Sequence, residues 1–201
     1  MFIAHLPAGY LLAHHLLKKN STLPVSPRAL TLTAMAGAIA PDLDMLYFYF
    51  IDHGQTHHHK YLSHWPILWI GLLYISVLAV GVMKRKPLPF LVLIFSLGGL
   101  LHMLLDSMVG DIWWLAPIVD QPYALFTVPA RFQPWWLNFV LHWSFVIELL
   151  IIVWAARIHW QASHRRQRLL SLLVTVARRK GKKRQCRLRD EPIESKKKSR
   201  S

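Results

Sequence analysis

Three long apolar runs dominate the pattern of hydrophobic and polar positions along the 201-residue chain. They cover residues 67–83, 88–105 and 137–156, and basic residues directly follow the first run and the third. A helix rises about 1.5 Å per residue and a bilayer core is about 30 Å thick, so each run is roughly long enough to cross, two of them on the short side. We therefore predict three membrane-spanning helices from these runs.

Two weaker apolar runs precede them, at residues 2–17 and 29–41. Each is short enough to form a tilted or half-buried helix. The first run lacks a basic segment before it and carries His5, which argues against a cleaved signal peptide. The predicted fold class is all-α: a polytopic helical membrane protein with about five transmembrane or half-membrane helices.

Charge divides the chain into an apolar body and a basic tail. Residues 157–201 hold 16 Lys and Arg against 3 Asp and Glu, whereas residues 1–156 hold 8 against 7. We predict a membrane domain over 1–156 and a cytoplasmic juxtamembrane segment over 157–201, beside anionic lipid. Within this tail, residues 158–180 resemble an amphipathic helix lying on the inner surface and residues 181–201 a disordered end. The tail lacks interleaved aromatic residues, so no specific nucleic-acid partner is expected.

The positive-inside rule predicts an orientation for the membrane domain. It places the basic residues next to the apolar runs, and the whole tail, in the cytoplasm. If all five runs cross, their other ends meet on the extracytoplasmic side, and these ends carry His5, Asp42, Asp44, the 52–64 segment, His102 and Asp106. The Trp- and Pro-rich segment 107–136 is predicted to form an interfacial lid on that side, with tryptophans at headgroup level.

The segment 52–66, "DHGQTHHHKYLSHWP", holds five histidines directly before an apolar run. Histidine stabilises helices and strands poorly but is a good metal ligand and proton carrier near neutral pH. The chain has one cysteine, Cys186, so a disulfide within the chain and a thiolate zinc site are both excluded. Any metal must be held by histidine and carboxylate.

Four short motifs supply such groups. "HMLLD" places His102 and Asp106 four residues apart, on one face of a helix. "PDLD" offers two carboxylates in a turn, "HHKYLSH" offers His59 and His64, and His5 opens the first run. Each motif alone also fits a plainer explanation, such as a helix end in water, a polar loop or an isolated histidine. His57 and His58 are left open as extra ligands, proton carriers or solvated neighbours.

Taken together, the motifs predict a metal site. The expected ligands are His5, Asp42, Asp44, His59, His64, His102 and Asp106. Seven donors exceed one tetrahedral site and fit two or three ions with bridging carboxylates. Zinc is the expected metal, with manganese and iron as alternatives. Asp42 and Asp44 are the candidate catalytic groups, as bridging ligand or general base.

The ordered set of motifs resembles a family of bacterial inner-membrane, metal-dependent hydrolases, some of which are SOS-regulated. That family reads P-D-[IL]-D, then H-R-x-x-T-H, then H-x-x-x-D followed by a Trp-Pro element. Here the resemblance covers about residues 1–120, with Lys60 in place of Arg, Ser63 in place of Thr, and "WWLAP" at 113–117. A fainter similarity in motif order to zinc-dependent phospholipase C and P1-type nucleases implies phosphoester hydrolysis.

Three functional hypotheses follow from these features. The first is a bacterial inner-membrane hydrolase that acts on a phosphoester or a lipid-like substrate. The second is a metal transporter, which would need ionisable groups within the spans, where only His142 and Glu148 are found. The third is a non-catalytic membrane scaffold whose basic tail recruits lipid or protein.

Overall fold

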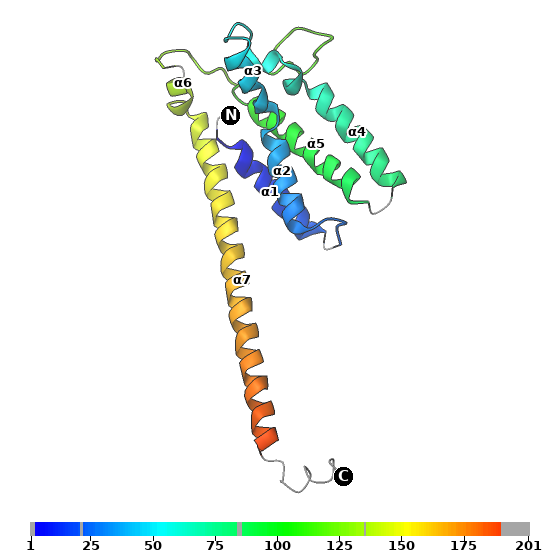
Figure 1. The fold of residues 1–201 in the computed structure, drawn as a ribbon. Coiled ribbons are helices and arrows are strands. Elements are labelled where there is room, and N and C mark those ends of the chain that lie inside the picture. The colour runs from blue at the N-terminus through cyan, green and yellow to red at the C-terminus, as the bar shows by residue number, and fades with distance from the viewer. Residues whose placement is uncertain (1–2, 21, 84–85, 135, 190–201) are drawn as a thin grey trace. The chain divides into compact units, whose positions relative to one another are not determined.

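The protein is mostly helical in a computed structural model, which describes residues 3–20, 22–83, 86–134 and 136–189. Within these residues the one β-type pairing is an isolated bridge between Ile112 and Tyr123. The elements are α1 His5–Lys19, α2 Pro27–Ile39, η1 Pro41–Leu43, α3 Asp44–Phe50, η2 His58–Lys60, η3 Leu62–His64, α4 Pro66–Val82, α5 Pro87–Asp106, α6 Trp136–Val140 and α7 Ser144–Arg189 (Figure 1). The predicted all-α class is confirmed.

Helices α1, α2, α4 and α5 form the packed body, in which α2 lies against both α1 and α5, and α5 also lies against α4 (Figure 1). Small residues allow the close approach. A Cβ on Gly98 would lie 2.7 Å from the carbonyl oxygen of Ala34, and one on Gly37 would collide with the carbonyl of Phe95. Small residues at helix contacts are typical of membrane bundles, where dispersion contacts rather than water exclusion hold helices together. This packing fixes the register of α2 against α5, and each of these helices leads into the candidate site.

Length and apolar composition qualify two helices as membrane spans, namely α5 and the segment Ser144–Leu173 of α7. The pair α2 and Pro41–Phe50 qualifies as a third span if the two parts are taken together, with a bend of 55° between them. Helix α4 is apolar but has only 17 residues. The bend lies at Pro41, which has no backbone N–H to donate to the preceding turn of α2.

The predicted span 137–156 is wrong as a single helix. The structure breaks it into α6 and the start of α7, with a turn at residues 141–143. Polar side chains explain the break, because they hydrogen-bond to nearby groups in place of the helix ladder. Nδ1 of His142 lies 2.8 Å from the hydroxyl of Ser144, and the Asn138 side chain bonds the backbone of Arg131 and Phe132.

The basic tail also differs from expectation. Helix α7 continues without interruption to Arg189, so residues 181–189, predicted to be disordered, are helical. The rest of the predicted disordered end, residues 190–201, lies outside the described residues. The chain divides into two compact units, Met1–Ala155 and Ala156–Ser201, and the candidate site belongs wholly to the first.

Glu148 has a structural role at the start of α1. Its Oε2 accepts hydrogen bonds from the backbone N–H groups of Ile3 at 2.6 Å and of Ala4 at 3.2 Å. Helix N-terminal N–H groups have no partner within the helix and favour a negative charge. The carboxylate therefore anchors the residues that lead into His5, within the first compact unit.

Candidate metal centre

Five elements of the first compact unit deliver imidazoles and carboxylates to one point in the fold. Helix α1 contributes its first residue, η1 the carboxylate after Pro41, η2 and η3 one histidine each, and α5 a pair in its last turn. The residues brought together are His5, Asp42, His59, His64, His102 and Asp106. Apart from Asp42, all of these side chains are buried.

The pair on α5 forms the floor of the cluster. His102 and Asp106 share one face of the helix, and His102 Nε2 lies 3.0 Å from Asp106 Oδ2. His102 Nδ1 lies 2.8 Å from the carbonyl oxygen of Ala38. A carbonyl oxygen only accepts hydrogen bonds, so Nδ1 donates to it and Nε2 is the nitrogen that faces the carboxylates.

His64 is oriented in the same way by a carboxylate. Its Nδ1 donates to Asp44 Oδ2 at 2.6 Å, and the hydroxyl of Ser63 donates to the same oxygen. His64 Nε2 then faces Asp42 Oδ1 at 3.7 Å and Asp106 Oδ2 at 4.0 Å. A carboxylate that holds the far nitrogen of a metal-ligating histidine is a recurrent feature of metal sites.

The same environment alters the protonation of His64. Burial alone would lower the pKa of its imidazole, but the carboxylates of Asp42 and Asp44 outweigh that effect and raise the pKa to about 9. Asp44 Oδ1 is buried and has no hydrogen-bond partner among the described residues. Asp44 thus touches the cluster through His64, whose ring it holds by the Nδ1 hydrogen bond.

His59 approaches from the histidine-rich segment. Its Nδ1 lies 3.0 Å from the backbone carbonyl oxygen of Asp111, and its Nε2 lies 3.5 Å from Asp106 Oδ2. The ring fits only because residue 110 is glycine, since a Cβ there would lie 2.8 Å from Cε1 of His59. The segment after α5 thus shapes the site through its backbone.

His5 completes the cluster from the opposite side. Its ring stacks on His102 with centroids 3.8 Å apart. Its Nε2 lies 3.0 Å from Asp106 Oδ1, and its Nδ1 lies 3.5 Å from Asp42 Oδ2. Both carboxylates therefore use one oxygen toward His5 and the other toward the remaining histidines, which is the arrangement of a bridging carboxylate.

The donor set fits a divalent metal. Ligand atoms about 2.1 Å from a tetrahedral ion lie about 3.4 Å from one another, and the contacts between donor nitrogens and oxygens here run from 3.0 to 4.0 Å. One donor atom from each of Asp42, His64, His102 and Asp106 falls within 4.8 Å of all the others. Among the described residues, Nε2 of His64, Nε2 of His102 and both ring nitrogens of His5 are buried, and the polar atoms that they face are the carboxylate oxygens of Asp42 and Asp106, at 3.0–4.0 Å. Buried polar atoms that converge in this way are costly unless a ligand satisfies them.

A second group of donors adjoins the first and shares His64. It comprises His58, His59 and His64, again with one donor atom of each within 4.8 Å of the others. Burial, together with the positive charges of neighbouring histidines, lowers the pKa of His58 to about 4 and that of His59 well below its usual value. Because a metal binds the neutral imidazole, these shifts favour ligation by His58 and His59, whereas a metal at His64 must displace the proton that Asp42 and Asp44 stabilise.

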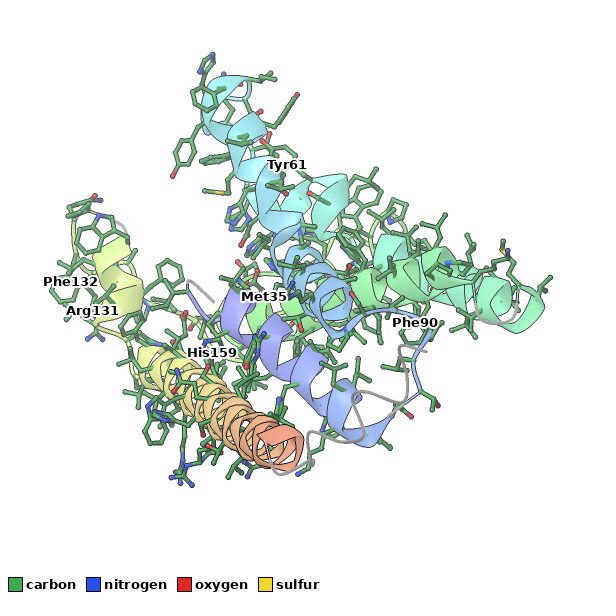
Figure 2. The ribbon with its side chains drawn as sticks, turned by 60° about the horizontal axis from the view of Figure 1, so that its bottom comes forward. Met35, Tyr61, Phe90, Arg131, Phe132 and His159 are labelled. Carbon is green, nitrogen blue, oxygen red and sulfur yellow. The ribbon has the colours of Figure 1, made fainter. Side chains whose placement is uncertain are left out.

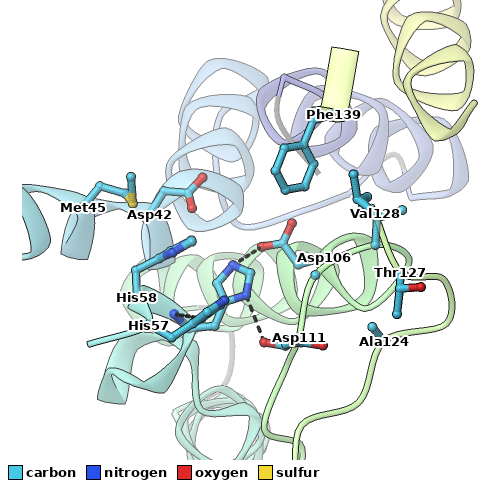
Figure 3. A pocket seen from close by; sticks show the side chains of 13 residues that line it. Asp42, Met45, His57, His58, Asp106, Asp111, Ala124, Thr127, Val128 and Phe139 are labelled. Atoms are coloured by element: carbon cyan, nitrogen blue, oxygen red, sulfur yellow. Dashed lines mark hydrogen bonds and ion pairs between the residues drawn. The ribbon is translucent and has the colours of Figure 1, made fainter. Parts of the chain in front are cut away.

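A cavity of about 400 Å³ opens onto these groups. Figure 3 shows Asp42, His58 and Asp106 on its polar side and Val128 and Phe139 across from them. The side chain of Asp42 is 39% exposed, whereas that of Asp106 is 2% exposed. Both bridging carboxylates line the cavity, and Asp42 is the more exposed of the two.

All seven residues predicted as ligands lie in or beside this cluster. Six face its centre, and Asp44 stands behind His64. Sequence reasoning missed the orienting carbonyls of Ala38 and Asp111, because backbone acceptors leave no trace in residue type. It left His58 undecided, although a run of three histidines was a signal for a second ligand group. It also missed the apolar cavity wall, which the segment after residue 124 and α6 provide.

Comparison with known proteins places the chain in a family. Residues 1–180 match the family described as YdjM inner membrane protein, and the chain belongs to that family. The match bears out the expected inner-membrane family and agrees with a membrane location, and the hydrolase activity implied by the resemblance stays a prediction. Comparison with curated proteins and with solved structures gives no match.

Proposed function

We propose that this member of the YdjM inner membrane protein family is a metal-dependent hydrolase that acts on a phosphoester. The observation that carries the proposal is the convergence of buried histidine nitrogens on two carboxylates, with three of the rings oriented from behind by oxygen acceptors. A divalent ion placed among these nitrogens and the two carboxylates would satisfy all of them, and one donor atom from each of four residues lies close enough to the others to share such an ion. Zinc is the proposed metal, with manganese or iron as alternatives.

The proposed first site uses Asp42, His64, His102 and Asp106, and the second uses His58, His59 and His64. A divalent ion in such a site lowers the pKa of a water molecule and polarises a phosphoryl oxygen. Asp44, Ala38 and Asp111 are positioning residues, because each fixes a ring through Nδ1. This arrangement holds the ligands rigid, as hydrolytic sites require.

Asp42 is the proposed proton acceptor, because it is the more exposed of the two cluster carboxylates that line the cavity. In the reaction, the oxygen of a water molecule forms a bond to phosphorus and one phosphorus–oxygen ester bond breaks. The proton of the water passes to Asp42 and then to the departing alkoxide. The products are an alcohol and a phosphate carrying one ester group fewer.

The transporter hypothesis loses one of its two supports. Glu148, one of two ionisable groups in the third apolar run, is engaged with the backbone at the start of α1. Its placement agrees with an anchoring role in the helix bundle. This contact favours hydrolysis over metal transport.

The test is turnover of bis(p-nitrophenyl) phosphate, a soluble phosphodiester, by detergent-purified protein loaded with zinc or manganese. We expect His102→Ala and Asp106→Ala to lose both bound metal and turnover. His15→Ala, which removes an exposed histidine of α1 far along the helix from His5, should behave like the wild type. Full turnover in both cluster variants would overturn the proposal.

A further inference from the structure

The lengths of the helices indicate how deep the candidate site lies in the membrane. Helix α1 has 15 residues and ends in Lys18 and Lys19, and α2 has 13 residues and begins next to Arg28. At about 1.5 Å per residue these helices measure about 22 and 20 Å. Helix α5, which begins after Lys86 and ends at Asp106, has 20 residues and measures about 30 Å, the thickness of a hydrocarbon core, so basic ends at the cytoplasmic interface place the site close to the opposite one.

Helix α3 extends from the site at that interface. It has seven residues, about 10 Å of helix, and none of them is buried. Leu46, Tyr49 and Phe50 are exposed on α3, with Phe50 75% exposed. Tyr61 lies beside α3, where its ring meets that of Tyr47 edge-on (Figure 2). Exposed aliphatic and aromatic side chains with tyrosine hydroxyls suit the boundary between acyl chains and headgroups.

The wall of the cavity is amphipathic. Met45, Val109, Val128 and Phe139 give it an apolar side, and the histidines and carboxylates of the cluster give it a polar side (Figure 3). Asp111 adds a further carboxylate. Among the described residues that line the cavity there is no Lys or Arg. A ligand with several negative charges, such as a nucleotide, would find no cation here besides the metal ions.

The charge of the loaded site suits one negative charge on the substrate. Two divalent ions bring four positive charges, and the carboxylates of Asp42, Asp44 and Asp106 cancel three of them. A phosphodiester carries one negative charge and balances the remainder. Asp111, which lies beside His59 in the cavity wall, can then balance a positive charge elsewhere in the substrate.

We propose that the substrate is a zwitterionic phospholipid of the extracytoplasmic leaflet, which reaches the site laterally from the membrane. This inference rests on the proposed function. The phosphodiester lies at the cluster, the ammonium group of the headgroup lies near Asp111, and the start of the acyl chains lies against Phe139 and Val128. The reaction is the hydrolysis described above. Water adds to phosphorus, one phosphorus–oxygen ester bond breaks, and the proton of the water ends on the departing alkoxide.

The test compares three probes on zinc-loaded protein in mixed micelles: phosphatidylethanolamine, phosphatidylglycerol and bis(p-nitrophenyl) phosphate. We expect phosphatidylethanolamine to be hydrolysed at least tenfold faster than either of the others. Asp111→Asn should reduce the preference for phosphatidylethanolamine over phosphatidylglycerol about tenfold, because it removes the charge and keeps the backbone carbonyl that bonds His59.

Two further variants test the apolar wall. Phe139→Ser and Val128→Ser should each lower the ratio of phosphatidylethanolamine turnover to soluble diester turnover, about tenfold for the larger side chain. Phe132→Ser, which changes a partly exposed phenylalanine outside the cavity, should leave that ratio at the wild-type value. Using two wall variants guards against a folding defect in either one.

The two proposals fail in different ways. Hydrolysis of the soluble diester at a rate equal to or above that of phosphatidylethanolamine overturns the lipid assignment and leaves the proposed function standing. Equal turnover of the two phospholipids overturns the role of Asp111. No hydrolysis of any probe by protein with bound metal overturns the proposed function and the lipid assignment with it.

Discussion

Removing the carboxylate behind His64 should weaken metal binding without abolishing it. Asp44 Oδ2 accepts the Nδ1 proton of His64 at 2.6 Å, in a place where His64 is fully buried. Loss of a partner of this kind typically lowers metal affinity about 10- to 100-fold, or about 1.4 to 2.8 kcal/mol. Asp44→Ala should therefore raise the dissociation constant by that factor, whereas Asp106→Ala, which removes a direct ligand, should leave no measurable binding at that site.

The assay is competition for zinc between purified protein and a chromophoric chelator. Asp44→Asn should lose less affinity than Asp44→Ala, because an amide oxygen can still accept from Nδ1. Asp52→Asn is the matched control, since that carboxylate bonds Thr56 outside the cluster. Wild-type affinity in Asp44→Ala would refute the positioning role, and a loss as complete as that of Asp106→Ala would show that Asp44 itself ligates the metal.

Three further perturbations have expected outcomes. Gly110→Ala should lower zinc affinity in the same competition assay, because its Cβ displaces His59, whereas Gly71→Ala, at a position with open space, should not. Glu148→Ala should lower the free energy of unfolding by about 1–3 kcal/mol, because it leaves the N–H donors at the start of α1 without an acceptor. Chemical denaturation in detergent measures this loss, and Glu148→Gln should lose less. In metal-free protein, the ion pairs of protonated His64 raise its pKa to about 9 and stabilise the fold fully below pH 6.5. This stabilisation is lost as the pH rises through about 9, so the melting temperature should fall between pH 6.5 and 9.

The gathering of ligands at one end of the bundle was predictable from two simple patterns. Basic residues mark one end of each apolar run, and the histidines and aspartates occupy the other end, so the positive-inside rule alone predicts that these side chains meet on one side of the membrane. The pairing of His102 with Asp106 followed from helical spacing alone. These features depend only on residue type and sequence distance.

The orientation of each imidazole was not predictable, since it depends on which oxygen lies behind the ring. The carbonyls of Ala38 and Asp111 reach His102 and His59 only after α2, α5 and the following segment have packed. The break in the 137–156 run was also hidden. Hydropathy averages over a window, whereas the turn arises from one local contact between His142 and Ser144.

The metal content of the purified protein tests the account most directly. We would measure zinc, manganese and iron by mass spectrometry in detergent-purified wild type and in the double variant His64→Ala/Asp106→Ala. The account predicts two metal ions per wild-type chain and a loss of both in the double variant, because His64 belongs to both donor groups and Asp106 to the first. Well-folded wild type that holds no metal after reconstitution with each of the three ions would contradict it.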